Sequence, residues 1–245
     1  METTLDVRGV TRRYGTREVL KGITFAAQKG EIIALLGRNG TGKSTLMSVL
    51  FGLYQPEKGE IRKDGETVSI RNPNDATALG IGMVHQHFKL VECFTVLDNI
   101  ILGVEPTKFG FLQKKEARQK VLALSERYGL HVDPDAKVED ITVGMQQRTE
   151  ILKMLYRDNE ILIFDEPTAV LTPQETDKLF AVMRNMKADG KSLIIITHKL
   201  HEVLDVSDRV AVLRKGEYVG DVATKDADQQ SLTDMMVGHT VSLNI

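Results

Sequence analysis

The strongest signal in this sequence is the loop Gly37-Arg38-Asn39-Gly40-Thr41-Gly42-Lys43-Ser44-Thr45. It matches G-x-x-x-x-G-K-[ST], the P-loop pattern of proteins that bind nucleoside phosphates. Its glycines allow backbone N–H groups to turn inward around phosphate oxygens, and the N-terminus of a following helix adds partial positive charge. The pattern therefore predicts a phosphate-binding loop, and a glycine-rich turn without a ligand is the alternative.

The residues on both sides of this loop favour the phosphate-binding interpretation. Residues 31–36 (EIIALL) form an apolar run typical of a strand buried on both faces, and residues 43–51 have a helical pattern. In such a strand–loop–helix unit, Lys43 is expected to reach the β- and γ-phosphates and Ser44 to hold Mg²⁺. We expect all the loop residues, from Gly37 to Thr45, to contribute to the nucleotide site.

A second apolar run, residues 161–164, ends in the adjacent carboxylates Asp165 and Glu166. We expect this run to be a buried strand that places Asp165 beside the P-loop, where it completes the metal site. Glu166 is then expected to act as the general base or to orient the attacking water. Two solvated charges at the start of a loop are the alternative.

Composition limits the class of protein. The 245 residues are long for one simple domain and short for two, which favours one domain with a sizeable insertion. The net charge of −2 does not suggest nucleic-acid binding, and the single cysteine, Cys93, fits a reducing cytosol. No apolar run approaches the ~18–20 residues that cross a bilayer, and the first residues lack a signal sequence. If the protein serves a membrane, we expect it to do so through a membrane-spanning partner.

Strand-like runs alternate with helical ones, which predicts an α/β fold. Residues 4–10 and 22–27 alternate like antiparallel strands, and residues 192–197 resemble another buried strand. We expect one domain over residues 1–245, with a core at about 1–86 and 160–245 and a helical subdomain inserted at about 87–159. The remaining expected elements are helices at 95–102, 114–128, 144–156, 173–187 and 229–237, a loop at 103–113, and a hairpin near Lys215-Gly216.

The motifs together resemble one family. Asp165-Glu166-Pro167-Thr168, the upstream P-loop, and Thr197-His198 at the end of the next predicted strand resemble the ATP-binding cassette (ABC) ATPases. The resemblance extends from Leu5 to about Gly238. It implies an ATPase that binds Mg-ATP on an α/β, P-loop NTPase core of ABC ATPase type, with an antiparallel β subdomain and an inserted α-helical subdomain.

The same resemblance implies roles for three further side chains. Tyr14 would stack on adenine, Gln86 would contact Mg²⁺ and water, and His198 would contact the γ-phosphate. A packed surface tyrosine, an ordinary loop amide and a structural histidine are the alternatives.

Two stretches depart from the family pattern. Ile141-Thr142-Val143-Gly144-Met145-Gln146-Gln147-Arg148 matches the family's Leu-Ser-Gly-Gly-Gln stretch, but Val143 and Met145 differ from it. The resemblance implies that Thr142 and Gly144 bind the γ-phosphate held by a second ABC ATPase domain, in the same polypeptide or in a dimer. An ordinary helix cap is the alternative. Thr172 stands where the family usually has Asp, and Thr172-Pro173-Gln174-Glu175 predicts a capping box.

Within the family, the sequence looks most like the importer ATPases for nucleosides and simple sugars, which include riboflavin- and ribose-type systems. The stretches concerned are Met145-Gln146-Gln147-Arg148, residues 167–175 and residues 197–203. The likeness implies membrane permeases as partners, a solute-binding lipoprotein as an indirect one, and a place at the cytoplasmic face of the cell membrane. A soluble ABC ATPase of repair or translation and a non-catalytic nucleotide-binding module are the alternatives.

Two further expectations concern assembly. Phe88, Leu90, Val91 and Phe94 are expected to be exposed and to receive a permease helix, with core packing as the alternative. Because this branch typically fuses two ATPase domains, the chain is expected to be the N-terminal half of a tandem polypeptide.

Overall fold

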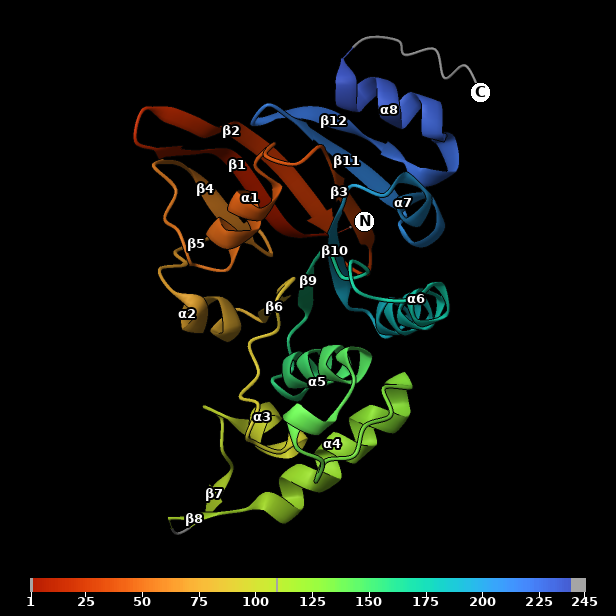
Figure 1. Cartoon of the computed structure of the whole chain (residues 1–245). Helices are drawn as coiled ribbons and strands as arrows, with labels where there is room; N and C mark the ends of the chain where they lie inside the picture. Colours follow the sequence, from red (N-terminus) through yellow and green to blue (C-terminus); the bar gives the residue numbers. More distant parts are fainter. Residues whose placement is uncertain (1, 109, 239–245) are drawn as a thin grey trace.

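The computed structural model describes residues 2–108 and 110–238, and within them the chain forms two large sheets, against which helices pack, and one two-stranded hairpin (Figure 1). The larger sheet has the order β12-β11-β3-β10-β9-β6, in which β12 is antiparallel to β11 and the other neighbours are parallel. Its strands are β3 (Ile32–Leu36), β6 (Ile81–Val84), β9 (Ile161–Asp165), β10 (Ser192–Thr197), β11 (Arg209–Arg214) and β12 (Glu217–Ala223). Because β3, β9 and β10 run parallel, their carboxyl ends lie at the same edge of the sheet.

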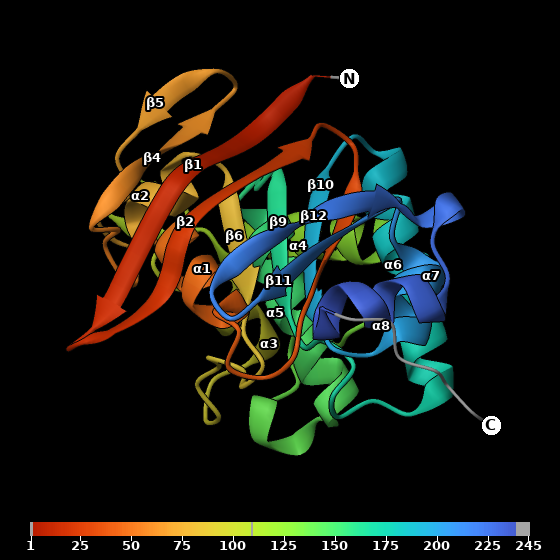
Figure 2. The ribbon, with the colours of Figure 1, turned by 90° about the horizontal axis from the view of Figure 1, so that it is seen from above.

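The second sheet is antiparallel, with the order β2-β1-β4-β5, and lies along one side of the molecule (Figure 2). Its strands are β1 (Thr3–Tyr14), β2 (Arg17–Gln28), β4 (Lys58–Lys63) and β5 (Glu66–Val68). Alternate residues of β1 and β2 are buried, such as Leu5 and Val7, and they pack against α1 (Lys43–Leu50). The same core cluster contains Ile33 and Leu35 of β3, so α1 is enclosed between the two sheets.

Helices α5 (Val143–Tyr156) and α6 (Pro173–Ala188) pack on β3, β9 and β10 through a second core cluster, which includes Ile32 and Phe164. Helices α7 (Leu200–Val206) and α8 (Gln229–Val237) pack against β3 and β11 through a third cluster, and η2 (Thr224–Asp226) precedes α8. Alternate residues of β3 thus contact helices on opposite faces, which explains why its sequence is apolar throughout.

A largely helical segment separates β6 from β9 (Figure 1). It contains α3 (Val96–Ile101), β7 (Thr107–Lys108), β8 (Phe111–Leu112), α4 (Lys114–Tyr128), η1 (Val138–Asp140) and α5. Thr95 begins α3, because its hydroxyl accepts the Asp98 N–H at 3.1 Å. Within its described residues this segment adds no strand to either large sheet. The boundaries that we propose for the helical subdomain, about 87 and 159, lie just after β6 and just before β9.

The α/β fold class is confirmed, with an antiparallel sheet and an inserted helical segment. Two details of the sequence analysis were wrong or incomplete. Residues 103–113, expected as a loop, contain the short hairpin β7–β8. Four elements between α1 and the helical segment were not anticipated: β4, β5, α2 (Pro73–Ala78) and β6. In β4 a single residue, Ile61, is buried among charged neighbours, so the strand has no apolar pattern to detect.

The capping box at Thr172 is present: Glu175 N donates to the Thr172 hydroxyl, and Thr172 N donates to the Glu175 carboxylate at 2.9 Å. Of the four apolar side chains expected at the surface, Phe94 is exposed, whereas Leu90 and Val91 are partly buried. Phe88 packs against the second core cluster, so its expected exposure was wrong. In the part of the chain that the structure describes, no helix combines the length and the apolar character needed to cross a membrane.

Candidate functional site

The loop between β3 and α1 requires glycine at defined positions. Gly40 and Gly42 have φ values of 78° and 101°, a left-handed conformation that favours glycine. A Cβ on Gly42 would lie 2.8 Å from the Leu20 side chain and 2.9 Å from the Val19 carbonyl oxygen. A Cβ on Gly37 would lie 2.6 Å from the Leu213 carbonyl oxygen. The neighbouring strands therefore fix the loop in the compact form that the P-loop pattern predicts.

Lys43 lies at the start of α1 and is buried, with 5% of its surface exposed. Its Nζ donates to the carbonyl oxygens of Gly37 at 2.6 Å and Arg38 at 3.1 Å, so its ammonium group lies within the curve of the loop. Burial lowers the pKa of Lys43, while the carboxylates of Glu166 and Asp165 act in the opposite direction. The three charges form one cluster, in which the lysine is the counter-ion of two carboxylates.

Asp165 is the last residue of β9, and its carboxylate lies near Ser44 and Lys43. Burial raises the pKa of Asp165, and the neighbouring Glu166 raises it further, against the effects of Lys43 and Ser44. Oδ1 of Asp165 and Oε2 of Glu166 are buried, and neither has a hydrogen-bond partner among the described residues. Unpartnered buried carboxylate oxygens are costly in a folded chain, which indicates that they serve a ligand or metal.

Glu166 has φ of 48°, a left-handed conformation that is strained for a residue with a side chain. Its N–H donates to the Ile196 carbonyl oxygen at 2.9 Å, which supports this backbone. Its Oε1 lies 2.9 Å from Nδ1 of His198, which follows β10. The strained backbone and the histidine together aim the glutamate into the site.

A pocket of about 450 Å³ lies at this edge of the larger sheet. The expected site residues that line it are Asn39, Gly40, Gly42, Lys43, Ser44, Thr45, Gln86, Glu166 and His198. Arg38 and Thr41 line an adjoining pocket together with Asn39 and Gly40, while Gly37 and Asp165 lie behind the lining. The structure thus brings together residues that are up to 159 positions apart in the sequence, from Asn39 to His198. Arg17, Val19 and Ala169 also line the pocket, and no sequence pattern marks them.

Tyr14 ends β1 beside this pocket without lining it, and 41% of its surface is exposed. Burial raises the pKa of its hydroxyl group, while the nearby Thr45 of the P-loop acts to lower that pKa. Tyr54 packs edge-on against it at 5.6 Å between ring centroids, and the Arg12 guanidinium lies 5.4 Å from the Tyr14 ring. Tyr14 therefore belongs to an exposed aromatic cluster next to the P-loop, of which sequence reasoning identified one member.

Thr142 and Gly144 lie at the start of α5 and do not line the P-loop pocket of their own chain. The Thr142 hydroxyl accepts the Met145 N–H at 3.3 Å, so it caps the helix. Thr142 is exposed, as is Val143 beside it. The start of this helix therefore lies outside the nucleotide pocket of its own chain.

Two buried side chains of α5, both missed in the sequence analysis, connect the helix to the site. Gln147 Nε2 donates to the Pro167 carbonyl oxygen at 2.6 Å, next to Glu166. Glu150 accepts the Lys89 N–H at 2.8 Å, three residues after Gln86. Burial raises the pKa of Glu150. The helix that begins at Thr142 is thus hydrogen-bonded to the chain segments that follow Gln86 and Glu166, two of the polar residues of the pocket.

The residues present fit a magnesium ion. The Ser44 hydroxyl, the unpartnered Asp165 carboxylate oxygen and the Gln86 side chain offer the oxygen ligands that Mg²⁺ prefers. Over residues 2–108 and 110–238 there is no group of three or more His, Cys, Asp and Glu that could hold a metal. Such a cage is not required here, because Mg²⁺ usually binds through one or two protein ligands together with substrate phosphates.

Asp165→Asn should raise the melting temperature of the nucleotide-free protein at pH 7, despite removing a residue of the site. In the folded chain the pKa of Asp165 lies above its ordinary value, which means that folding favours the protonated, uncharged carboxyl group. Its contribution to the stability of the fold is therefore present at low pH and is lost as the pH rises through the folded-state pKa. At pH 7 the ionised carboxylate destabilises the folded chain, and the uncharged asparagine does not. The substitution should therefore raise the melting temperature by about 2–4 °C, equivalent to roughly 1 kcal/mol for a chain of this size.

Thermal unfolding of Asp165→Asn and wild type at pH 4 and pH 7 measures this effect. The gain should shrink at pH 4, where wild-type Asp165 is more protonated. Asp177→Asn, an exposed position on α6, is the matched control and should leave the melting temperature unchanged. A lower melting temperature for Asp165→Asn at pH 7 would contradict the argument.

The fold and the site define a class: a P-loop nucleotide-binding protein with a lysine, two strand-end carboxylates and a histidine around one pocket. A comparison with protein families gives the particular family, because the model described as "ABC transporter" matches residues 20–169. The chain belongs to the ABC transporter family.

Individual curated relatives carry names that are more specific than the family description. The chain is 55% identical over 242 residues to the guanosine import ATP-binding protein NupO of Bacillus subtilis, covering 99% of this chain and 48% of that protein. It is 53% identical over 241 residues to the nucleoside import ATP-binding protein NupA of Lactococcus lactis, covering 98% of this chain and 48% of that protein. The chain therefore spans about half the length of these two relatives.

Solved structures agree on the fold. An ATP-binding cassette of an ABC transporter in its ADP conformation matches with a TM-score of 0.83 at 22% identity, covering 98% of this chain and 100% of that one. CbiO1 of Clostridium perfringens, part of the ABC transporter complex CbiONQ, matches with a TM-score of 0.80 at 28% identity, covering 92% of this chain and 90% of that one.

Proposed function

We propose that this chain binds and hydrolyses Mg-ATP as the motor domain of an importer for nucleosides or related small solutes. One observation supports the ATPase activity above all: Lys43, Glu166 and His198, from three separate elements, line the same pocket as the P-loop glycines. The intact charge cluster argues against a non-catalytic nucleotide-binding module. The names of the relatives, which include nucleoside and guanosine import, support the importer assignment over repair or translation.

The geometry suggests how the residues divide the reaction. The P-loop N–H groups and Lys43 hold the β- and γ-phosphates, and Glu166 accepts a proton from the attacking water or orients it. His198, hydrogen-bonded to Glu166, fixes the direction of that carboxylate and lies where the γ-phosphate is expected. Magnesium, held by Ser44, Asp165 and Gln86, would supply positive charge that offsets the charge on the phosphates.

The site needs a second ABC ATPase domain, in the same polypeptide or in a dimer. The exposed helix start at Thr142 and Gly144 presents N–H groups outward, away from its own P-loop pocket. A helix N-terminus is a ready anion site, so this surface fits the γ-phosphate held by the partner domain. Gln147 and Glu150 would then transmit the position of α5 to the loops beside Glu166 and Gln86.

Permease subunits are the proposed membrane partners, with a solute-binding lipoprotein as an indirect one, and the proposed location is the cytoplasmic face of the cell membrane. Phe94 is the proposed permease contact, because 40% of its surface is exposed on the segment that follows Gln86.

Phe94→Asp should abolish uptake of labelled guanosine by the assembled transporter while sparing its basal ATPase activity. An exposed charge costs the fold little, but it disrupts an apolar contact with a permease. Cys93→Ser, at the exposed neighbouring position, is the control and should transport normally. Failure of the wild-type complex to take up any nucleoside would overturn the assigned solute class. Normal uptake by Phe94→Asp would remove only the proposed contact.

Tyr14→Ala should weaken ATP binding by about 1–3 kcal/mol, the usual value of base stacking on an aromatic ring. Because a ring face makes no hydrogen bonds to base edges, we also expect only modest preference for ATP over GTP. Titration with fluorescent ATP and GTP analogues measures both effects. Tyr14→Phe is the matched control and should retain most of the affinity. Unchanged ATP affinity in Tyr14→Ala would exclude this residue from the site.

A further inference from the structure

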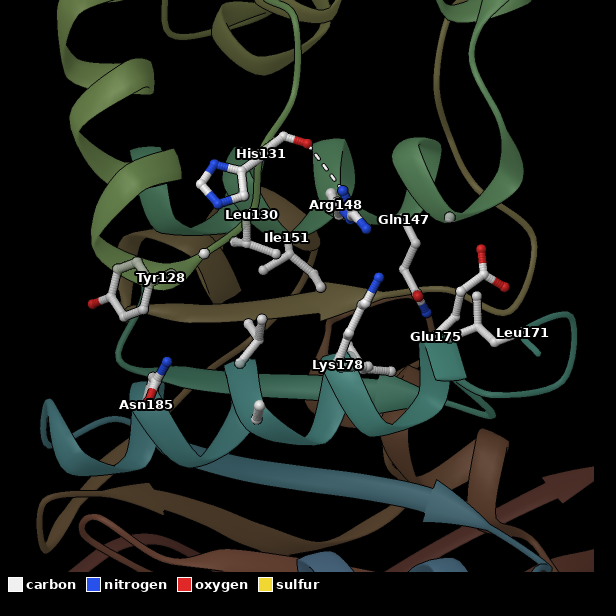
Figure 3. Close-up of a pocket in the computed structure, with 15 residues that line it drawn as sticks. Tyr128, Leu130, His131, Gln147, Arg148, Ile151, Leu171, Glu175, Lys178 and Asn185 are labelled. Carbon is white, nitrogen blue, oxygen red and sulfur yellow. Dashed lines mark hydrogen bonds between the residues drawn. The ribbon is translucent and has the colours of Figure 1, made fainter. Parts of the chain in front are cut away.

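A second pocket, of about 340 Å³, lies between α5, the turn after α4 and α6 (Figure 3). It is separate from the P-loop pocket, with which it shares no lining residue. Its volume is at the lower end of the range for small-molecule sites. Two of its lining residues, Gly144 and Gln147, have roles in the proposed function, but the space itself does not.

One wall of this pocket is apolar. Leu171, Leu179 and Val182 line it from α6 and the chain just before that helix. Leu179 and Val182 are otherwise buried, with 6% and 7% of their surface exposed. This wall suits the apolar body of a ligand.

A second feature of the pocket is an excess of positively charged side chains. Lys178 extends from α6 across the gap, and its amino group points toward Arg148 of α5 (Figure 3). Arg148 donates to the His131 carbonyl oxygen at 3.1 Å. Among the ion pairs of the described residues, neither Arg148 nor Lys178 has a carboxylate partner. One carboxylate, Glu175, lies near enough to interact with both, so two converging positive charges share a single negative one, which favours a further anion between them.

The acidic side chain in the lining is Glu175, and it does not neutralise both cations. Its Oε2 accepts hydrogen bonds from the Thr172 N–H and the Thr172 hydroxyl, each at 2.9 Å. The carboxylate also caps α6, and its single negative charge is shared between Arg148 and Lys178. Counting Arg148 and Lys178 against Glu175 leaves one positive charge in excess.

We propose that this pocket binds a small organic anion that has one negative charge and a flat apolar body, such as an aromatic carboxylate. The carboxylate lies between Lys178 and Arg148, and the ring packs on Leu179 and Val182. The occupant contacts α5 and α6 at once, beside Gly144 and Gln147. Since Gln147 bonds the Pro167 carbonyl oxygen, the ligand lies next to the contact that joins α5 to the loop after Glu166.

The test is calorimetric titration of the whole chain with 1-naphthoate, in the presence of saturating Mg-ADP so that the P-loop pocket is occupied. We expect saturable binding to the wild type. Lys178→Glu should weaken it by at least about tenfold, the loss expected of one charged hydrogen bond. The neutral analogue 1-naphthalenemethanol should bind the wild type at least about tenfold more weakly for the same reason.

Two variants distinguish binding in this pocket from a general effect of the protein's net charge. Lys178→Arg keeps the charge and should retain binding. Lys115→Glu makes the same charge change at an exposed position on α4 that does not line the pocket, and should leave the affinity unchanged. Absence of saturable binding to the wild type would overturn the proposal. So would equal affinity in Lys178→Glu, or equal affinity for the neutral alcohol.

Discussion

Glu166→Gln should lower ATP turnover by at least ~100-fold, the lower end of what a general base contributes, while leaving Mg-ATP binding intact. Glutamine has nearly the same shape and can still bond His198, which lies 2.9 Å from Oε1 in the wild type. The strained backbone at φ 48° is also unchanged by this substitution. What is lost is the negative charge that accepts or orients a proton of the attacking water. Steady-state phosphate release, measured alongside titration with a fluorescent ATP analogue, separates turnover from binding.

The assembled transporter is the appropriate sample for this measurement, because the proposed site needs a second ATPase domain. Glu126→Gln removes an exposed carboxylate on α4, away from every proposed contact, and should turn over ATP like the wild type. If Glu166→Gln hydrolysed ATP at a rate close to wild type, another group would have to be the base. If it failed to bind ATP, the residue would instead be part of the binding surface.

Local patterns were enough to predict which residues lie together at the candidate site, since each of its parts is encoded in a short stretch. The P-loop needs glycine at Gly40 and Gly42 for conformation and at Gly37 for space, so the spacing itself is visible in the sequence. Asp165 was recognisable because it follows four buried apolar residues that form a strand. The capping box at Thr172 and Glu175 is likewise a relation between near neighbours.

Interactions between distant residues were not predictable in this way. Gln147 and Glu150 look like ordinary polar residues of a helix, and their partners at Pro167 and Lys89 are 20 and 61 positions away. Tyr54 joins Tyr14 because β1 and the turn after α1 come together in space, which no local periodicity records.

Surface strands and surface exposure were also poorly predicted. The charged strand β4 has no alternation beyond Ile61, because its neighbours face water. Phe88 and Phe94 have the same apolar character in the sequence, yet one packs on the core and the other is exposed. Which of two similar side chains is buried depends on tertiary packing, and the sequence pattern alone did not distinguish them.

Lys43→Ala should weaken ATP binding itself by about 10–100-fold, in contrast to Glu166→Gln. The ammonium group is held inside the loop by the carbonyl oxygens of Gly37 at 2.6 Å and Arg38 at 3.1 Å, so it is placed for phosphate oxygens before any ligand arrives. A hydrogen bond to a charged group contributes about 1.5–3 kcal/mol, and each 1.4 kcal/mol corresponds to a tenfold change in affinity.

Adenosine separates loss of the phosphate contact from damage to the site. It has no phosphate, so its affinity should be the same for Lys43→Ala and wild type, whereas ATP affinity falls. Lys115→Ala, at an exposed position on α4, controls for the loss of a positive charge elsewhere and should bind ATP normally. Equal losses for ATP and adenosine would indicate a disrupted pocket. Unchanged ATP affinity would mean that the backbone N–H groups of the loop hold the phosphates without this lysine, and that Lys43 serves mainly as the counter-ion of Asp165 and Glu166.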